Sequence, residues 1–169
     1  TTGTNNTLIG GLAGDATTTG QYNTVVGGNA FTSNTTGTGN TSLGTSSLRD
    51  NTTANYNVAV GLDALQQNTT AANNTALGSY ALTANTTGTQ NTAVGYTSLA
   101  ANTQGIYNTA IGYDSLGTTT TGSYNIGLGR DAKSTSATAS NQCTLGDSNI
   151  NNLRCNDTSL SSLSDSRDK

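Results

Sequence analysis

Apolar and polar positions follow a unit of 17 residues that recurs along the chain without an insertion or deletion. Each unit contains a glycine, directly preceded by a branched apolar residue. The glycine column is Gly10, Gly27, Gly44, Gly61, Gly78, Gly95, Gly112, Gly129 and Gly146. The apolar column is Ile9, Val26, Leu43, Val60, Leu77, Val94, Ile111, Leu128 and Leu145. Because a fixed period is typical of stacked repeats, we predict nine coils of a solenoid.

Three further columns share this period. The asparagine column is Asn6, Asn23, Asn40, Asn57, Asn74, Asn91, Asn108 and Asn125, with Gln142 at its end. The small column is Ala13, Ala30, Ser47, Ala64, Ala81, Ser98, Ser115 and Ala132. The leucine column follows it as Phe31, Leu48, Leu65, Leu82, Leu99 and Leu116. A helical hairpin repeat needs more residues than this unit offers, and glycine, threonine and asparagine disfavour helices, so each coil is expected to contain a short strand.

The stretch before each glycine alternates with a period of two, as a strand does. In the second unit Thr24 and Val26 point to one face, and Val25 points to the other. Val58 and Ile126 replace the threonine in two units, which predicts that the threonine face is partly buried. The position equivalent to Val25 is small in most units, which suits close approach by another backbone.

The expected fold is therefore an all-β, parallel β-solenoid whose identical residues stack into ladders. Stacked asparagine side chains can hydrogen-bond along such a ladder, which gives the asparagine column a structural role. A rod this thin buries few apolar side chains per coil. We therefore predict that several chains pack side by side as a parallel homo-oligomer, with the small and leucine columns supplying a shared core.

Composition excludes several functions. Six Lys and Arg residues stand against nine acidic residues, for a net charge of −3, so nucleic-acid binding is disfavoured. No apolar run is long enough to cross a bilayer, so membrane insertion is not expected. With no histidine and only two cysteines, Cys143 and Cys155, we expect no metal and no cofactor. Cys143 stands in the threonine register, so we predict a packed thiol.

Two units carry a resemblance to a known family. Residues 91–99 (Asn-Thr-Ala-Val-Gly-Tyr-Thr-Ser-Leu) and 108–116 (Asn-Thr-Ala-Ile-Gly-Tyr-Asp-Ser-Leu) resemble the head repeats of trimeric autotransporter adhesins. The resemblance covers residues 1–146 and implies a left-handed parallel β-roll shaft in a homotrimer. The family's usual unit is shorter than 17 residues, and similar long units occur in bacteriophage tail fibres.

The C-terminal part differs in character, since ten of the fifteen charged residues lie from Arg130 onward. Residues 147–163 look like the trimeric β neck of a phage tail fibre. Residues 164–169 match the Ser-Asp-x-Arg-x-Lys opening of the endosialidase-type intramolecular chaperone, a self-cleaving domain. The resemblance implies that Ser164 is the nucleophile, that Lys169 is its general base and that the bond between Leu163 and Ser164 is cut. A lysine side chain can act as a general base when desolvation lowers its pKa.

Other repeated residues have simpler interpretations. Asp63, Asp114 and Asp131 share a register and suggest a calcium ladder, but repeat-type calcium sites need more oxygen ligands per coil, which favours a solvated turn. The Asn-x-Thr sequons at Asn34, Asn51, Asn68 and Asn85 are expected by chance in this composition. The tyrosines, in two registers, favour packing between coils over sugar binding. The paired threonines resemble ice-binding solenoids, but adjacent residues of a strand point to opposite faces.

These observations predict a structural and adhesive segment of a phage tail fibre, located on the virion and directed toward a glycan or protein of the host cell surface. The alternative is a bacterial trimeric surface adhesin with the same fold, located at the cell surface. An ice-binding solenoid is a remote third possibility. With no histidine, no glutamate and no carboxylate cluster, we expect no turnover enzyme, only a single self-cleavage.

Overall fold

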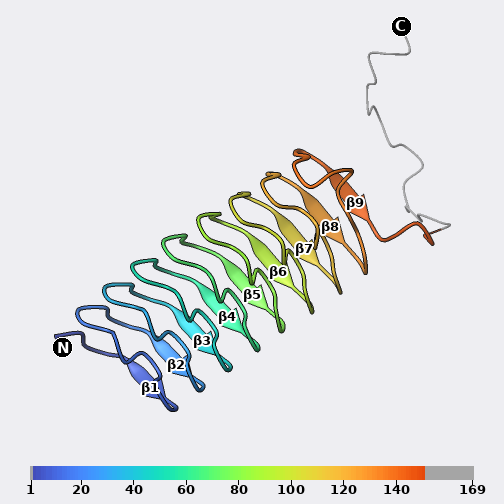
Figure 1. Ribbon diagram of the computed structural model, residues 1–169. Helices are drawn as coiled ribbons and strands as arrows, with labels where there is room; N and C mark the ends of the chain where they lie inside the picture. The colour runs from blue at the N-terminus through green and yellow to red at the C-terminus, as the bar shows by residue number, and fades with distance from the viewer. Residues whose placement is uncertain (1, 151–169) are drawn as a thin grey trace, which may run out of the picture.

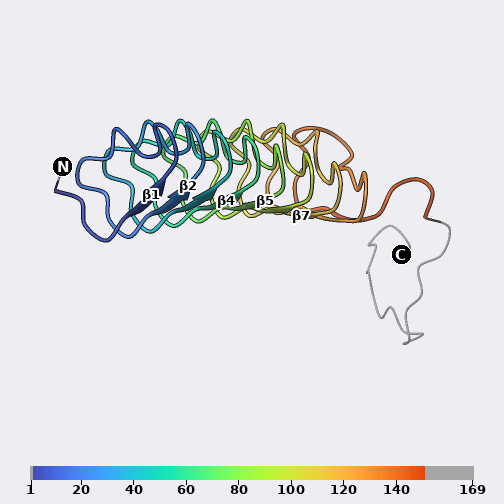
Figure 2. The same cartoon turned by 90° about the horizontal axis from the view of Figure 1, so that it is seen from below.

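The computed structural model describes residues 2–150, which form one parallel β-solenoid (Figure 1). Each coil contributes one three-residue strand to a single nine-stranded sheet, and no helix occurs among the described residues. The strands are β1 (Thr7–Ile9), β2 (Thr24–Val26), β3 (Thr41–Leu43), β4 (Val58–Val60), β5 (Thr75–Leu77), β6 (Thr92–Val94), β7 (Thr109–Ile111), β8 (Ile126–Leu128) and β9 (Cys143–Leu145). Figure 2 shows the strands along one side of the rod. The predicted solenoid is confirmed.

The order of strands in the sheet is their order in the chain, and every neighbouring pair is parallel. Each residue pairs with the residue 17 positions later, as Thr24 does with Thr41 and Val26 does with Leu43. The absence of insertions fixes this register through all nine strands, because one extra residue would turn every later side chain to the opposite face.

The interior of the coil holds the apolar core. Phe31 and all leucines of the leucine column are fully buried, as are the alanines of the small column after Ala13. The middle residues of the strands, such as Val25 and Ala59, are also fully buried. The prediction that the small and leucine columns form a core shared between chains is therefore wrong. They form the core of each single chain, because the loops fold the leucine column back under the strands.

The asparagine column forms a continuous hydrogen-bonded ladder inside the coil. The backbone N–H of Asn40 donates to Oδ1 of Asn23 at 2.9 Å, and Nδ2 of Asn40 donates to the same oxygen at 3.1 Å. Nδ2 of Asn40 also donates to the carbonyl oxygen of Ala54 at 2.9 Å, across the interior of its own coil. The asparagine side chain thus joins two coils and closes one, which confirms the predicted ladder.

A second asparagine ladder runs through the loop opposite the strands. Its members are Asn34, Asn51, Asn68, Asn85 and Asn102, and all are fully buried. In this ladder Nδ2 of Asn51 donates to Oδ1 of Asn34 at 3.0 Å, and the N–H of Gly37 donates to the same oxygen at 3.0 Å. These asparagines recur every 17 residues in the sequence, but asparagine beside threonine and glycine is also typical of an exposed turn, so their spacing alone does not predict a buried ladder.

The backbone turns sharply at two columns for different reasons. At Gly44 φ is 139°, and a Cβ there would lie 2.5 Å from the carbonyl oxygen of Gly61 in the next coil, so only glycine fits. The leucine column has φ between 48° and 57°, a left-handed conformation that costs roughly 1–2 kcal/mol for a residue with a Cβ. Full burial of each leucine side chain, worth roughly 1.5–3 kcal/mol, offsets that cost.

The repeating coils run through the described part of residues 1–146, and the division of the chain into shaft, neck and chaperone start stays a prediction. Of the predicted neck, residues 147–163, the structure describes only residues 147–150, which form a turn in which the N–H of Ile150 donates to the carbonyl oxygen of Asp147. Residues 151–163 and the predicted chaperone start, residues 164–169, lie outside the described residues.

We predict that Asn57→Ala lowers the free energy of unfolding by about 3 kcal/mol. The change leaves the buried N–H of Asn74 without an acceptor, which costs roughly 1–3 kcal/mol, and removes one of the two amide donors to the carbonyl oxygen of Ala71, the other being Nδ2 of Asn68. Urea denaturation followed by circular dichroism measures the difference. The matched control is Gln67→Ala, which removes an exposed amide and should change stability by less than about 0.5 kcal/mol. Equal effects of the two variants would contradict the structural role of the ladder.

Candidate functional site

The sheet turns one row of apolar side chains to the outside of the coil. We call this surface the outward strand face; it consists of the apolar column and of the first residue of each strand. Ile9, Leu43, Leu77 and Ile111 on this face are 57%, 47%, 47% and 45% exposed. The sequence predicted partial burial of this face. The prediction holds for Val26, Val60 and Val94 but not for the leucines and isoleucines, nor for Val58, which is 38% exposed. The interior takes the small middle residue of each strand instead, because the leucine column already fills the space beneath it.

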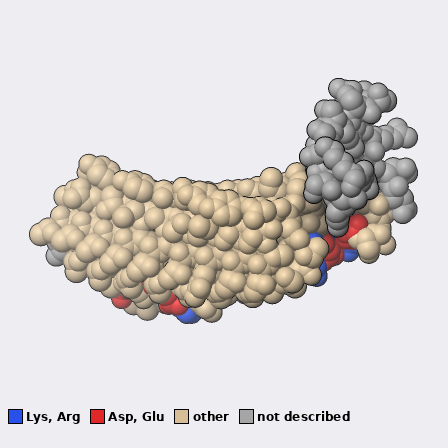
Figure 3. All heavy atoms as spheres, turned by 90° about the horizontal axis from the view of Figure 1, so that it is seen from above, with Lys and Arg blue, Asp and Glu red and all other residues tan. Residues whose placement is uncertain are grey.

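No charged side chain lies on the outward strand face of the described chain. Figure 3 shows a largely uncharged rod, with acidic and basic side chains gathered along one edge and near the C-terminal end. Arg49, Asp50 and Asp63 lie in the loops that follow the glycine column. A long, exposed apolar surface without charges is typical of a protein interface.

A register that holds tyrosine in four of the nine coils borders this face on the side where each strand begins. We call it the tyrosine row; its members are Asn5, Tyr22, Gly39, Tyr56, Asn73, Gln90, Tyr107, Tyr124 and Asn141. All nine have φ between 55° and 70°, a left-handed conformation that glycine and asparagine adopt readily and tyrosine does not. The four tyrosines of the row are 62%, 64%, 45% and 54% exposed in chain order, so burial does not offset their backbone strain as it does for the leucine column.

Several tyrosines stack between coils. The ring centroids of Tyr107 and Tyr124 lie 5.1 Å apart with an interplanar angle of 12°. On the other border of the strand face, Tyr96 stacks on Tyr113 at 5.6 Å, and Tyr80 meets the edge of Tyr96 at 5.8 Å. These contacts confirm the predicted packing between coils for five of the seven tyrosines.

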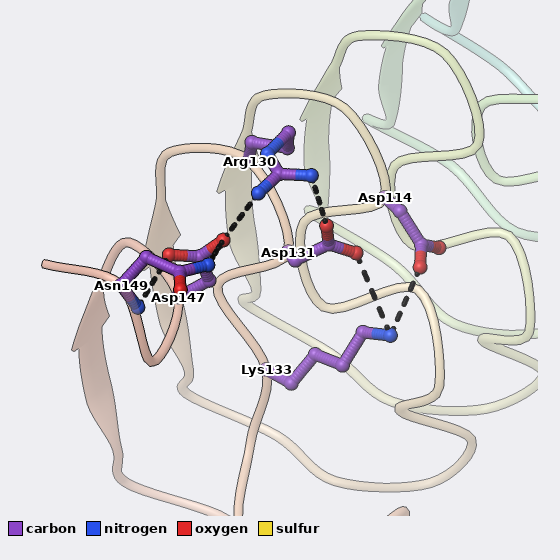
Figure 4. Close-up of polar contacts among 6 residues, drawn as sticks. All are labelled: Asp114, Arg130, Asp131, Lys133, Asp147 and Asn149. Carbon is purple, nitrogen blue, oxygen red and sulfur yellow. Dashed lines mark hydrogen bonds and ion pairs between the residues drawn. The ribbon is translucent and has the colours of Figure 1, made fainter.

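An ionic cluster joins the last coils of the described chain (Figure 4). Nζ of Lys133 lies 3.1 Å from Oδ2 of Asp114 and 3.6 Å from Oδ1 of Asp131. Nη1 of Arg130 lies 3.3 Å from Oδ2 of Asp131, and its Nη2 lies 2.6 Å from Oδ2 of Asp147. The cluster therefore connects the loops that follow β7, β8 and β9. Because Lys133 continues the register of the leucine column, it replaces the apolar core residue with a charge where the regular coils end.

Hydrogen bonds and charges in this cluster shift two pKa values. The carboxylate of Asp147 accepts from the backbone N–H of Asn149 at 2.9 Å and from its side-chain amide at 3.1 Å, and these bonds, with Arg130, hold the pKa of Asp147 below its ordinary value. The hydrogen bond to Asp114 raises the pKa of Lys133. The cluster lies at the surface, with Arg130 and Lys133 exposed and the aspartates partly exposed, so the contribution of each pair to stability is small.

The aspartate register shows the solvated turn favoured by the sequence. Asp114 and Asp131 pair with Lys133, and the carboxylate of Asp63 accepts from Nε2 of Gln66. No group of three or more His, Cys, Asp or Glu side chains among the described residues is placed to hold a metal ion. The aspartates thus form ion pairs with Lys133 or a hydrogen bond with Gln66 of the same chain.

The paired threonines do not form a flat surface of two columns. The first threonine of each pair turns its hydroxyl into the stack, as Thr52 does by donating to the carbonyl oxygen of Thr69 at 3.0 Å. The second, such as Thr53, is exposed. The four asparagines of the sequons belong to the second ladder and are fully buried, so the folded coil hides their amides.

The predicted catalytic residues Ser164 and Lys169 lie outside the described residues, and so does Cys155. Cys143, predicted as a packed thiol, is instead exposed, because the first residue of each strand faces outward. The outward strand face was missed as a surface because a column of nine apolar residues suggests an interior position. The sequence offered one signal for it, the small residue at the middle of most strands.

No known protein family, curated protein or solved structure matches the chain. Residues 2–150 contain no helix of the length and apolar character that a membrane span requires.

We predict that the pKa of Asp147 stays below the ordinary aspartate value when Arg130→Gln removes the guanidinium, because the largest cause is the N–H of Asn149. The stabilisation from Asp147 is present above the pKa of the unfolded carboxyl, about 3.9, and is lost as the pH falls through the lower folded value. Carboxyl titration by NMR measures both pKa values. Arg130→Gln should raise the pKa of Asp147 slightly. High salt should raise the pKa of Asp147 in the wild-type chain in the same way, since salt screens charges more than hydrogen bonds. An ordinary pKa in the wild-type chain would contradict the cluster.

Proposed function

We propose that this chain is the shaft of a bacteriophage tail fibre, a structural and adhesive segment that extends from the virion toward the host cell surface. In this proposal three chains run in parallel as a homotrimer of left-handed β-rolls. The segment performs no catalysis with turnover and needs no cofactor.

The observation that carries the proposal is the outward strand face. Leu43, Leu77 and Ile111 expose nearly half of their surfaces although the chain has its own filled core. Burying such side chains contributes roughly 25 cal/mol per Å² of apolar surface. In a parallel trimer the three faces meet at the axis, and identical coils lie at the same height, so apolar residues meet apolar residues along the whole shaft.

The shape of the chain suits a spacer. Nine strands stacked at about 4.8 Å give a rod on the order of 40 Å long, and further coils of the same kind would extend it without a new core design. The buried ladders hold every coil at the same distance from the next. A rod built in this way sets the reach of a fibre.

The second support is the sequence of residues 164–169, Ser-Asp-Ser-Arg-Asp-Lys, with its resemblance to the self-cleaving chaperone of phage fibres. Lys169, when neutral, accepts the hydroxyl proton of Ser164, whose Oγ attacks the carbonyl carbon of Leu163. The peptide C–N bond breaks, the proton passes to the amine of Ser164, and water hydrolyses the resulting ester.

The alternative is a bacterial trimeric surface adhesin at the cell surface. It has the same fold and uses the same outward strand face, so the described residues support both proteins. The Ser-Asp-x-Arg-x-Lys sequence favours the phage fibre.

We predict that the chain is a trimer in solution and that Leu77→Asp with Ile111→Asp converts it to monomers. The two aspartates place unpaired charges at the centre of the proposed interface, where desolvation is costly. Native mass spectrometry and light scattering measure the oligomeric state. The control, Thr53→Asp, adds a charge to an exposed loop position away from the strands and should leave the trimer intact.

Cys143 provides a test of which surfaces meet, because it lies on the outward strand face of β9. In a Cys155→Ser chain, mild oxidation should give a disulfide-linked dimer within each trimer. A monomeric wild-type chain at micromolar concentration would contradict the assembly, and a trimer without this cross-link would contradict the assigned face.

We predict that the chain, expressed within its complete gene, is cut between Leu163 and Ser164, and that Ser164→Ala and Lys169→Met each abolish the cut. The first variant removes the nucleophile and the second removes its base. Mass spectrometry of the mature chain identifies the C-terminus. An intact wild-type product, or cleavage that persists in Ser164→Ala, would contradict the chaperone assignment and remove its support for a phage origin.

A further inference from the structure

We propose that the tyrosine row is a binding site for neutral oligosaccharides, with Tyr22 and Tyr56 as its stacking rings. This inference rests on the proposed adhesive role of the shaft and assigns that role to particular residues.

The first argument is the backbone strain of these tyrosines, which burial of their side chains does not offset. Both have a left-handed backbone, with φ of 55° and 57°, at a register where other coils place Asn5, Asn73 or Gly39. Neither Tyr22 nor Tyr56 has an aromatic partner among the described residues, and they are 62% and 64% exposed. Strained residues whose cost no packing offsets concentrate at ligand sites.

The second argument is the position of the rings on the rod. Tyr56 lies over the backbone of Gly39, where a Cβ would come within 2.8 Å of its Cδ1 atom. Glycine at this position therefore leaves room for the ring of the next coil. Tyr22 and Tyr56 are two coils apart and share one register, so a ligand lying along the rod can contact both.

The third argument is the chemistry around the rings. Gln21 and Asn55 directly precede the two tyrosines and are half-buried. Oδ1 of Asn55 accepts from the N–H of Thr38 at 2.7 Å, and no partner occurs within the described chain for its Nδ2 donor. Between residues 4 and 113, no charged residue lies in the tyrosine row or in the strands that follow it. Aromatic faces beside amide donors, without charges, suit a ligand with an apolar ring face and many hydroxyl groups, which is a neutral saccharide.

The test uses the whole chain and a panel of maltohexaose, cellohexaose and chitohexaose. The chain contains seven tyrosines and no tryptophan, so its intrinsic fluorescence reports on tyrosine directly. We expect at least one oligosaccharide to change this fluorescence at millimolar concentration, and Tyr22→Asn with Tyr56→Asn to weaken binding about tenfold. Asparagine is the native residue of this register in other coils, so the variant keeps the fold.

Two further variants complete the design. Tyr22→Phe with Tyr56→Phe keeps the rings and should retain most of the binding. Gln67→Ala changes an exposed side chain outside the tyrosine row and should leave binding unchanged. Binding by no saccharide of the panel, or equal binding by the asparagine variant, would overturn the site. Light scattering on the same variants separates this result from the assembly. If the trimer dissociates when the tyrosines are replaced, the row lies in the interface between chains, and the proposed saccharide site is wrong. If the trimer stays intact but no saccharide binds, the shaft is a spacer only.

Discussion

Hydrogen bonding between identical residues in successive coils is the constraint on which this structure depends. The strands are only three residues long, so the sheet alone gives each coil few bonds to its neighbours. The two buried asparagine ladders add bonds on both sides of the interior, and each Oδ1 except that of Asn102, the last member of the second ladder, accepts from the next coil. A buried amide is costly unless it is satisfied. Because each Oδ1 of the first ladder accepts from the backbone N–H of the residue 17 positions later, this ladder links the coils at a constant period of 17 residues along the rod.

The fixed period explains the distribution of side chains around the coil. Ladders and leucines take the interior, where the left-handed backbone of the leucine column is offset by burial. The outward strand face is then left with exposed apolar residues, and the charges of residues 2–150 lie in the loops and in the cluster around Lys133. One side of the rod thus suits association with further copies of the chain. The loop side, which carries the charges, suits contact with water.

The tyrosine row shows how a regular backbone can carry an irregular surface. Every coil has the same left-handed residue before the asparagine column, but the sequence fills it with asparagine, glycine, glutamine or tyrosine. Such variation leaves the ladders untouched, since these side chains point out of the coil. Surface chemistry can therefore change from coil to coil while the interior remains constant. A solenoid built on this plan can acquire or lose surface contacts without a change of fold.

The sequence by itself determined the period, the number of coils, the position of the strands and the asparagine ladder, because these follow from residues that recur at fixed spacing. It did not decide which face of each strand is inside. Alternation places Val25 opposite Thr24 and Val26, but both faces carry residues that an interior can accept. Only the path of the loops, which brings the leucine column under the middle residue of the strand, turns Val26 outward. The same path buries Asn34 and Asn51 within what the sequence presents as a polar turn. Burial depends on how the whole coil closes. The period of the sequence shows only which residues occupy equivalent positions in successive coils.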